Sequence, residues 1–343
     1  MKIIFAGTPV FAVPFFESLL SDSDFEIVGI ITQPDKPVGR KQILTPSPVK
    51  ESAQNYNLPI FQPENFQDEK LINKLKNLKP DLMVVVAYGL IIPQEVLNIA
   101  KSGNINVHPS LLPKYRGASP IQNAILSGDQ KTGVTIMLMD EKMDHGPILA
   151  QEEIRLNGDE TGKTLPDKLA KIGAPLLIQT IKNYLAEKIQ PREQNHNEAT
   201  FCRLITKDEA KIDWSKPAEE IERKIRAFYP WPAAWTTLDG KRLKIFPPAV
   251  VLPLPEGVAL RRAEASKASV ACCDHRSNKR CPGIKKIMPP GMILEGVGEK
   301  DKLLISCDQS TLAISQLQFE GKKQMSTSEF LRGQKDLAGK ILT

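Results

Sequence analysis

Short apolar runs alternate with stretches of helical periodicity along the first half of the chain. The apolar runs have the length and composition of buried strands, and they cover residues 2–6, 25–31, 82–87, 104–108, 133–139 and 148–154. Helical periodicity marks residues 11–20, 49–55, 68–78, 93–100, 119–127 and 164–186. This alternation predicts an α/β fold built from βαβ units: a Rossmann-like open, parallel-type sheet with helices on both faces.

The pattern changes near residue 200. One helix is predicted over residues 218–227, and short strands then dominate, at residues 234–238, 243–246, 292–295, 302–306 and 312–317. Short strands at close spacing with glycine at the turns indicate a small β-barrel. The polar, weakly patterned segment between the two patterns is interpreted as a linker. We therefore expect a first domain over 1–189, a linker over 190–206 and a second domain over 207–343, with an insertion at about 254–290 that does not fit the barrel pattern.

Charge is distributed unevenly along the chain. The formal net charge is +6. Residues 1–200 hold 21 Lys+Arg and 23 Asp+Glu, a net of −2, whereas residues 201–343 hold 25 and 17, a net of +8. A near-neutral half joined to a basic half suggests that the second half binds a polyanion.

Cysteine usage argues against a disulfide-stabilised or zinc-binding protein, and the length of the apolar runs argues against a membrane protein. The five cysteines are spread widely, and Cys272 and Cys273 are adjacent, which does not match the Cys-x-x-Cys spacing of zinc sites. We therefore expect no disulfide framework and no metal. No apolar run approaches the roughly 20 residues of a membrane helix, and the first residues lack the features of a signal peptide. A soluble, cytoplasmic protein with no membrane partner is expected.

A dinucleotide cofactor is not supported by the first predicted turn. Gly7-Thr-Pro9 follows the first strand, where a nicotinamide-binding protein carries Gly-x-Gly-x-x-Gly. A Rossmann oxidoreductase is therefore the weaker interpretation.

Candidate chemistry concentrates in residues 104–120. Asn106 and His108 alternate with Ile105 and Val107, so on a strand the two polar side chains share one face. An amide donor beside an imidazole suits acyl transfer, because the amide can stabilise an oxyanion and the imidazole can move a proton. The alternative is a strand end at which both side chains serve only local hydrogen bonds.

The wider motif favours the catalytic interpretation. The stretch 108–117, His-Pro-Ser-Leu-Leu-Pro-Lys-Tyr-Arg-Gly, is followed by Pro120-Ile, by Gly133-Val-Thr and by Met143-Asp-His-Gly-Pro-Ile. Together these motifs resemble those of the folate-dependent formyltransferases. The resemblance implies a catalytic set of Asn106, His108 and Asp144 and a second domain of the OB-like barrel type. It also implies 10-formyltetrahydrofolate as formyl donor, contacted by the loop residues Ser110, Leu111, Leu112 and Pro113.

A long loop over residues 32–49 makes the chain resemble one branch of this family in particular. Its prolines, glycine and cations match the inserted loop of the family branch that acts on methionyl-tRNA, with Arg40 and Lys41 at the positions of the tRNA-binding cations. The implied reaction is formylation of the α-amino group of methionine on initiator tRNA. The implied partners are that tRNA and the folate, with the enzyme expected to be a monomer.

Two other functions remain open on the sequence. One is a sugar-nucleotide formyltransferase, which shares the catalytic set and also has a second domain. The other is an RNA-binding protein with a vestigial cleft, against which the completeness of the catalytic set argues. The basic insertion is either an added tRNA contact or a solvated loop.

Overall fold

The computed structural model describes residues 1–39, 41–254, 258–260, 286–294, 301–308, 310–334 and 336–343. The chain forms two compact units. The first comprises Met1–Ala124, Asp129–Gly158 and Thr164–Leu204, and the second comprises Ile125–Gly128, Asp159–Lys163 and Ile205–Thr343. Residues 190–204, which the sequence placed in a linker, thus belong to the first unit.

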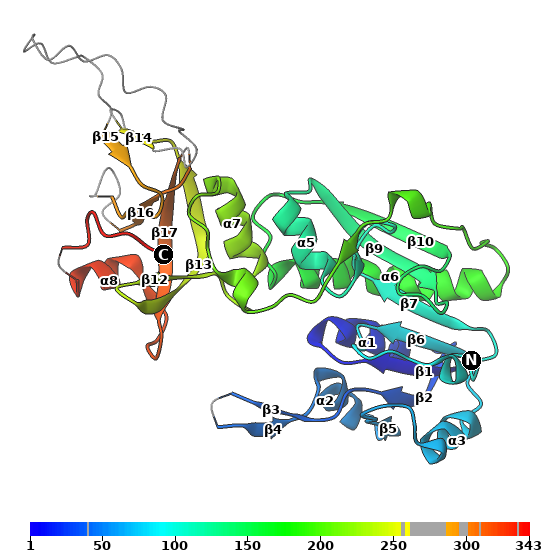
Figure 1. Ribbon diagram of the computed structural model, residues 1–343. Helices are drawn as coiled ribbons and strands as arrows, with labels where there is room; N and C mark the ends of the chain where they lie inside the picture. Colours follow the sequence, from blue (N-terminus) through cyan, green and yellow to red (C-terminus); the bar gives the residue numbers. More distant parts are fainter. Residues whose placement is uncertain (40, 255–257, 261–285, 295–300, 309, 335) are drawn as a thin grey trace, which may run out of the picture. The chain divides into compact units, whose positions relative to one another are not determined.

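A seven-stranded sheet forms the centre of the first unit (Figure 1). In sheet order its strands are β10 (Ile148–Arg155), β9 (Lys131–Leu138), β7 (Asn104–His108), β6 (Leu82–Val86), β1 (Lys2–Gly7), β2 (Glu26–Ile31) and β5 (Ile60–Phe61). The strands from β7 to β5 are parallel, whereas β9 and β10 run antiparallel to their neighbours. The all-apolar sequence of β6 follows from this position, because a central parallel strand is covered on both faces.

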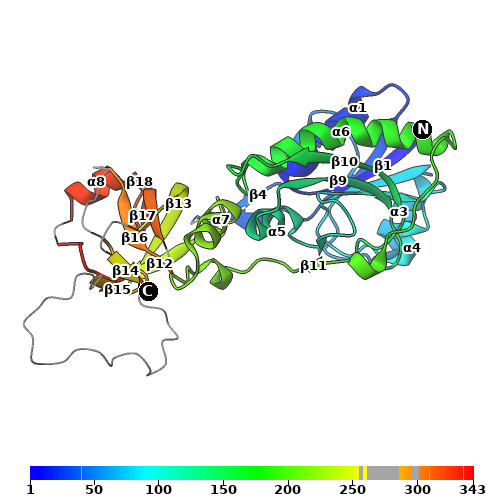
Figure 2. The same cartoon turned by 90° about the horizontal axis from the view of Figure 1, so that it is seen from above.

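Helices cover both faces of this sheet, as the alternating pattern predicted (Figure 2). On one face lie α1 (Val13–Ser21) and α6 (Thr164–Leu185). These two helices pack so closely that a Cβ atom, if added to Gly173 of α6, would lie only 2.9 Å from the ring of Phe15 in α1. On the other face lie α3 (Glu69–Asn77) and α4 (Gln94–Leu97), whose apolar residues share a core with Ile4 and Val85. α4 is shorter than the eight residues expected over 93–100.

The segment 32–49 is structured rather than an irregular loop. It contains an antiparallel hairpin of β3 (Lys36–Val38) and β4 (Ile43–Thr45), followed by α2 (Pro48–Gln54). Ser47 caps α2 by accepting a hydrogen bond from the backbone N–H of Lys50. A two-stranded ribbon of three residues a side lacks the long alternating run by which a strand is recognised in a sequence.

Short elements complete the first unit. They are the 3₁₀ turns η1 (Val10–Ala12) and η2 (His196–Glu198), and a small parallel pair of β8 (Arg116–Gly117) with β11 (Phe201–Cys202). α5 (Pro120–Ser127) follows β8 and agrees with the helix predicted over 119–127, although its residues from Ile125 onward belong to the second unit. The β8–β11 pair therefore binds the segment after residue 190 to the loop after β7.

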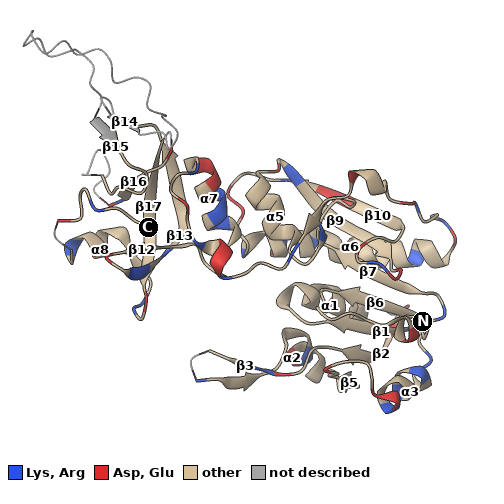
Figure 3. Ribbon diagram, viewed as in Figure 1, with Lys and Arg blue, Asp and Glu red and all other residues tan. Residues whose placement is uncertain are grey.

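The second unit contains a small antiparallel sheet (Figure 1). Its strands are β12 (Trp235–Leu238), β13 (Lys241–Leu252), β17 (Thr311–Phe319) and β16 (Leu303–Ser306), with β18 (Met325–Ser326) paired to β17. The helices η3 (Asp208–Ala210), α7 (Ala218–Ala227) and α8 (Thr327–Arg332) accompany it. Figure 3 shows both acidic and basic residues on α7. The first turn of this helix carries the acidic residues Glu219 and Glu220, and the last turn carries the basic residues Lys224 and Arg226.

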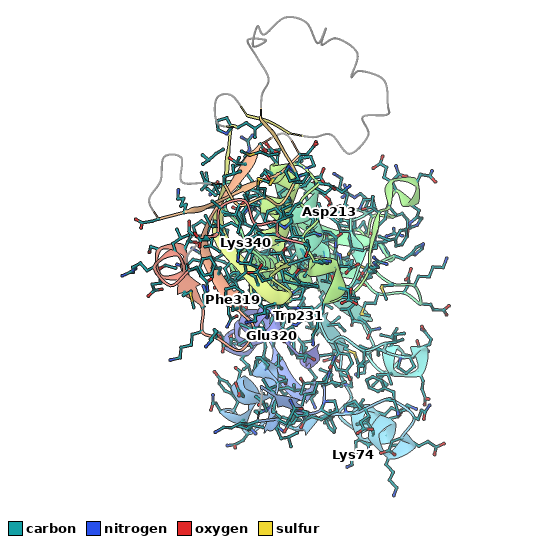
Figure 4. The ribbon with its side chains drawn as sticks, turned by 60° about the vertical axis from the view of Figure 1, so that its left-hand side comes forward. Lys74, Asp213, Trp231, Phe319, Glu320 and Lys340 are labelled. Atoms are coloured by element: carbon teal, nitrogen blue, oxygen red, sulfur yellow. The ribbon has the colours of Figure 1, made fainter. Side chains whose placement is uncertain are left out.

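Backbone bridges continue this sheet into a closed ring. Ile293 bridges to Ile305 of β16, and its neighbour Met292 bridges to Ile341 near the C-terminus. Thr343 and Thr237 of β12 then exchange two backbone hydrogen bonds, of 2.8 and 3.1 Å. The ion pair of Lys340, labelled in Figure 4, with Asp239 lies beside this junction at 2.6 Å. The expected barrel is thus closed by its last residues.

The predicted insertion 254–290 falls mostly outside the described residues. Its described parts include β14 (Val258–Leu260) and β15 (Lys286–Met288), which pair in parallel. Elsewhere, no helix among the described residues combines the length and apolarity needed to cross a membrane.

Candidate active site

β7 carries Asn106 and His108 to the carboxyl edge of the sheet. Ile105 and Val107 are 0% and 2% exposed and face the core, so the alternating pattern puts the two polar side chains on the opposite face. Asn106 is half-buried and His108 is buried. The predicted arrangement of these two residues on one face of a strand is therefore what the backbone provides.

His108 is held at both ring nitrogens. Its Nε2 lies 2.8 Å from the carbonyl oxygen of Tyr115, which can only accept, so this nitrogen carries a proton. Its Nδ1 faces Asp144, at 3.5 Å from Oδ1. Nδ1 is consequently the ring nitrogen that faces the carboxylate.

Asp144 comes from the turn between β9 and β10. Its backbone lies in the left-handed region, with φ of 49°, and its Oδ2 accepts a 2.8 Å hydrogen bond from the backbone N–H of Gly117. Its Oδ1 receives the Nδ2 amide of Asn106 at 3.4 Å, in addition to facing His108. The structure thus brings together three residues that the sequence separates by up to 38 positions.

This constellation can carry out acyl transfer to an amine. A neutral amide donor, an imidazole whose Nδ1 faces a carboxylate, and that carboxylate itself supply oxyanion stabilisation and a proton path. Their partial burial strengthens these interactions by excluding water.

The chain is similar to known proteins along its whole length. A formyl transferase model matches residues 1–181, and a model of the formyl transferase C-terminal domain matches residues 204–335. A protein of Alkaliphilus oremlandii named methionyl-tRNA formyltransferase is 42% identical over 342 residues, covering 100% of this chain and 99% of that protein. The chain belongs to the formyl transferase family.

Solved formyl transferases share the fold. Methionyl-tRNA formyltransferase from Clostridium thermocellum covers 73% of this chain and 93% of its own, with a TM-score of 0.51 and 21% identity. WlaRD, a sugar 3N-formyl transferase solved with dTDP and 5-N-formyl-THF, covers 94% of this chain and 99% of its own, with a TM-score of 0.59 and 19% identity. At these identities the likeness shows the shared architecture of the formyl transferases and no more.

The loop predicted to contact folate divides into buried and accessible residues. Ser110 and Leu112 are 0% and 3% exposed, and both are tied to Thr135, whose hydroxyl donates to the Ser110 carbonyl and accepts from the Leu112 amide. Leu111 and Pro113 are half-buried. In this formyl transferase, Ser110 and Leu112 therefore shape the loop, and Leu111 and Pro113 are the side chains of the four that a ligand can reach.

The predicted tRNA-binding cations fall between β3 and β4 in the sequence. Arg40 falls outside the described residues, and Lys41 beside it is exposed. Three apolar side chains of the same hairpin, Val38, Ile43 and Leu44, are 55%, 61% and 66% exposed. Such exposure on a short hairpin is typical of a surface that a partner covers.

Two buried polar atoms lack a hydrogen-bond partner within the described part of the chain: the hydroxyl of Tyr88 and Oδ1 of Asn104. Burial raises the pKa of Tyr88 to about 12, so its hydroxyl remains a neutral donor. Asn104 lies two residues before Asn106, on the same face of β7, with its Nδ2 bonded to the Leu97 carbonyl. The unpartnered Oδ1 of Asn104 is therefore a hydrogen-bond acceptor on the face of β7 that also carries Asn106 and His108.

The sequence did not indicate two buried residues beside Asp144. Arg116 is 4% exposed and donates through Nε and Nη2 to Oε1 of Gln194, which is 5% exposed. Arg116 lies within the family motif without an assigned role, and Gln194 lies in the segment interpreted as a linker. A single glutamine in a polar stretch carries no signal of burial, so only the tertiary structure could identify it.

No group of three His, Cys, Asp or Glu suited to a metal ion occurs among the described residues.

Proposed function

We propose that this protein transfers the formyl group of 10-formyltetrahydrofolate to the α-amino group of methionine carried by initiator tRNA. One observation carries the proposal: the similarity to proteins named methionyl-tRNA formyltransferase extends over the whole chain, including the hairpin and the second unit. A relative that shared only the formyl-transfer chemistry would not need to match the second unit at this level.

The proposed roles follow from the contacts of the three central residues. Formyl transfer forms a C–N bond to the neutral amine and breaks the bond from the formyl carbon to N10 of the folate, while one proton moves from the amine to N10. Asn106 Nδ2 is the donor for the negative charge that develops on the formyl oxygen. His108 is proposed to stabilise the same charge, and Asp144 orients His108 and accepts the amine proton at its carboxylate.

The residues present fit a folate donor, which supplies an activated formyl group when bound. The pterin has amide and amino donors, and the unpartnered Asn104 oxygen is an acceptor on the face of β7 that carries Asn106. Apolar groups for the ring are available after β6, where Leu90 and Ile91 are 38% and 85% exposed. Leu111 and Pro113 are proposed to complete the contact from the loop after β7.

The tRNA is proposed to contact both units. Arg40 and Lys41, which come between β3 and β4 in the sequence, are proposed to bind phosphates, because a guanidinium engages phosphate with a forked geometry and lysine adds a point charge. The exposed apolar side chains of the hairpin suit the base faces at the end of an acceptor stem. The net charge of +8 over residues 201–343 suits the remaining backbone.

A sugar nucleotide is the second candidate acceptor. It is favoured by the fold shared with WlaRD, which covers 94% of this chain despite its different acceptor. Purified protein offered 10-formyltetrahydrofolate with either charged initiator tRNA or an amino-sugar nucleotide separates the two. Formylation of the tRNA alone is expected, and formylation of the sugar nucleotide alone would replace the proposal.

Arg40 provides a sharper test within the tRNA assignment. Arg40→Ala should reduce kcat/KM for methionyl-tRNA by on the order of 10-fold or more and leave folate affinity unchanged, because a charge-assisted phosphate contact contributes about 1.5–3 kcal/mol. Arg40→Lys should recover part of the loss, since it restores charge without the fork.

The matched control is Arg155→Ala, which removes an exposed arginine of β10. This control should retain wild-type kcat/KM. Equal activity of Arg40→Ala and the control would exclude the hairpin from the acceptor site.

A further inference from the structure

The segment 192–202, here called the strap, is fastened along its length to the elements around Asp144. At its start, Arg192 and Ile148 of β10 exchange two backbone hydrogen bonds, of 2.8 and 2.7 Å. At its end, β11 pairs with β8, and the Thr200 carbonyl accepts from the amide of Arg116 at 2.8 Å. The strap therefore joins the strand that follows the Asp144 turn to the loop that supplies Gly117.

Gln194 is the residue of the strap that reaches the turn itself. Its Nε2 donates to the backbone carbonyls of Asp144 and Gly146, at 3.0 and 2.7 Å. The opposite end of the amide is fixed as well, because Oε1 accepts from Nε and Nη2 of Arg116 at 3.2 and 2.7 Å. With 5% of its surface exposed, Gln194 holds both carbonyls without competition from water.

The Asp144 turn requires such support. An aspartate at φ of 49° adopts a conformation that L-residues populate sparsely, and it persists only where neighbouring groups determine it. The two hydrogen bonds of Gln194 flank this residue on its C-terminal side, while Gly117 of β8 holds its carboxylate. Rotation of the turn would separate Oδ1 from both Asn106 and His108.

We propose that Gln194 is a positioning residue for formyl transfer, which sets the turn so that the Asp144 carboxylate faces Asn106 and His108. The inference rests on the proposed catalytic role of Asp144. Arg116 acts one step further away, by fixing the amide so that Nε2 rather than Oε1 points at the two carbonyls. The strap is thus part of the active-site framework of the first unit.

The discriminating variant is Gln194→Glu. It keeps side-chain length and the acceptor for Arg116, but it replaces the Nε2 donor with an oxygen that repels both carbonyls. Turnover should fall by on the order of 10–100-fold, the loss expected when a reacting group is displaced by about 1 Å. The KM values for both substrates should stay within about twofold, because a change in positioning alters the reaction step more than binding.

A double-mutant cycle with Asp144→Asn separates positioning from general support of the fold. If Gln194 acts through the Asp144 carboxylate, Gln194→Glu should cost less than about threefold in turnover once that carboxylate is absent. An equal cost in both backgrounds, or unchanged turnover of the folded single variant, would overturn the proposal. Wild-type turnover of Asp144→Asn alone would instead remove the catalytic role on which the inference rests.

Two further variants keep the test decisive. Gln190→Glu makes the same change at an exposed glutamine shortly before the strap and should leave turnover and KM unchanged. Should Gln194→Glu fail to fold, as judged by circular dichroism, Gln194→Met keeps the volume without either hydrogen-bonding end. Folded Gln194→Met with wild-type turnover would also overturn the proposal.

Discussion

At the scale of single residues, the geometry of the candidate site is set by the partner that each polar atom contacts. His108 commits Nε2 to the Tyr115 carbonyl and keeps Nδ1 toward Asp144, and Asn106 shares its amide with the same carboxylate. Each group is thus oriented by a neighbour within the set, so their contributions to the reaction are coupled.

Alanine substitutions test this coupling. Asn106→Ala, His108→Ala and Asp144→Ala should each reduce kcat strongly, and Asn106→Ala by on the order of 10²–10³, the usual effect of losing one oxyanion donor. Because the residues act as a unit, each double variant should lose much less than the product of the single losses. Steady-state kinetics on folded protein measures both quantities, and a folded single variant with near-wild-type kcat would exclude that residue from the set.

Gly117 is a second residue with a specific requirement. Its φ is 115°, a Cβ there would lie 2.2 Å from the Cys202 carbonyl, and its N–H donates to Asp144. Gly117→Ala should therefore lower both the free energy of unfolding, by more than about 1–3 kcal/mol of backbone strain, and kcat.

Gly158→Ala is the matched control for Gly117→Ala, measured by denaturant unfolding and turnover. Gly158 has φ of 91°, and a Cβ added there would meet nothing within 4 Å, so the substitution introduces strain without a clash. Gly158→Ala should be destabilised less than Gly117→Ala and should keep its kcat. Equal losses in both variants would show that the approach to Cys202 is unimportant.

At the scale of elements, closure of the small barrel depends on the last residues of the chain. Leu342 is 2% exposed in the core of the second unit, and its N–H donates to the Gly291 carbonyl, whereas Ile341 beside it is 46% exposed. A short C-terminal segment with this role could not be distinguished in the sequence from a frayed end.

The two neighbours provide a matched stability test. Leu342→Ala should lower the free energy of unfolding of the second unit by about 2–5 kcal/mol, the usual cost of a cavity at a buried leucine. Ile341→Ala should cost less than about 1 kcal/mol, since much of that side chain already faces water. Urea unfolding followed by the fluorescence of Trp214, Trp231 and Trp235, which all lie in the second unit, measures the stability of both variants. Similar unfolding midpoints for the two variants would argue against closure of the barrel by residues 341–343.

At the scale of the whole molecule, the two proposed substrates differ in how salt should affect their binding. If both the hairpin and the basic second half contact phosphates, raising salt from about 50 to about 200 mM should weaken tRNA binding steeply, with a slope of roughly −0.7 to −0.9 per phosphate in a log–log plot. Folate affinity should change much less, because its binding is expected to rest on apolar and hydrogen-bonding contacts. Titrations with each substrate test this, and parallel salt slopes would contradict the assignment of the hairpin and the basic second half to tRNA binding.

The sequence by itself determined the α/β architecture, most element positions and the pair Asn106 and His108. These features are local: strand and helix periods, and the alternation that puts two side chains on one face of β7. The family motif added Asp144, although the contact that joins it to β7 spans 38 positions.

Only the tertiary structure decided how Asp144 is held, which loop residues are buried and how the barrel closes. Gln194 lies in a polar stretch whose composition resembles a linker, and its burial arises from strand pairing at both ends of the strap. The β3–β4 hairpin and the bridges of residues 341–343 are likewise too short for a periodic signal. For Gln194 and for residues 341–343 the physical reason is that their stability comes from partners distant in the chain, and a local pattern contains no information about such partners. The β3–β4 hairpin pairs locally, but its three residues a side are too few for a period to be recognised.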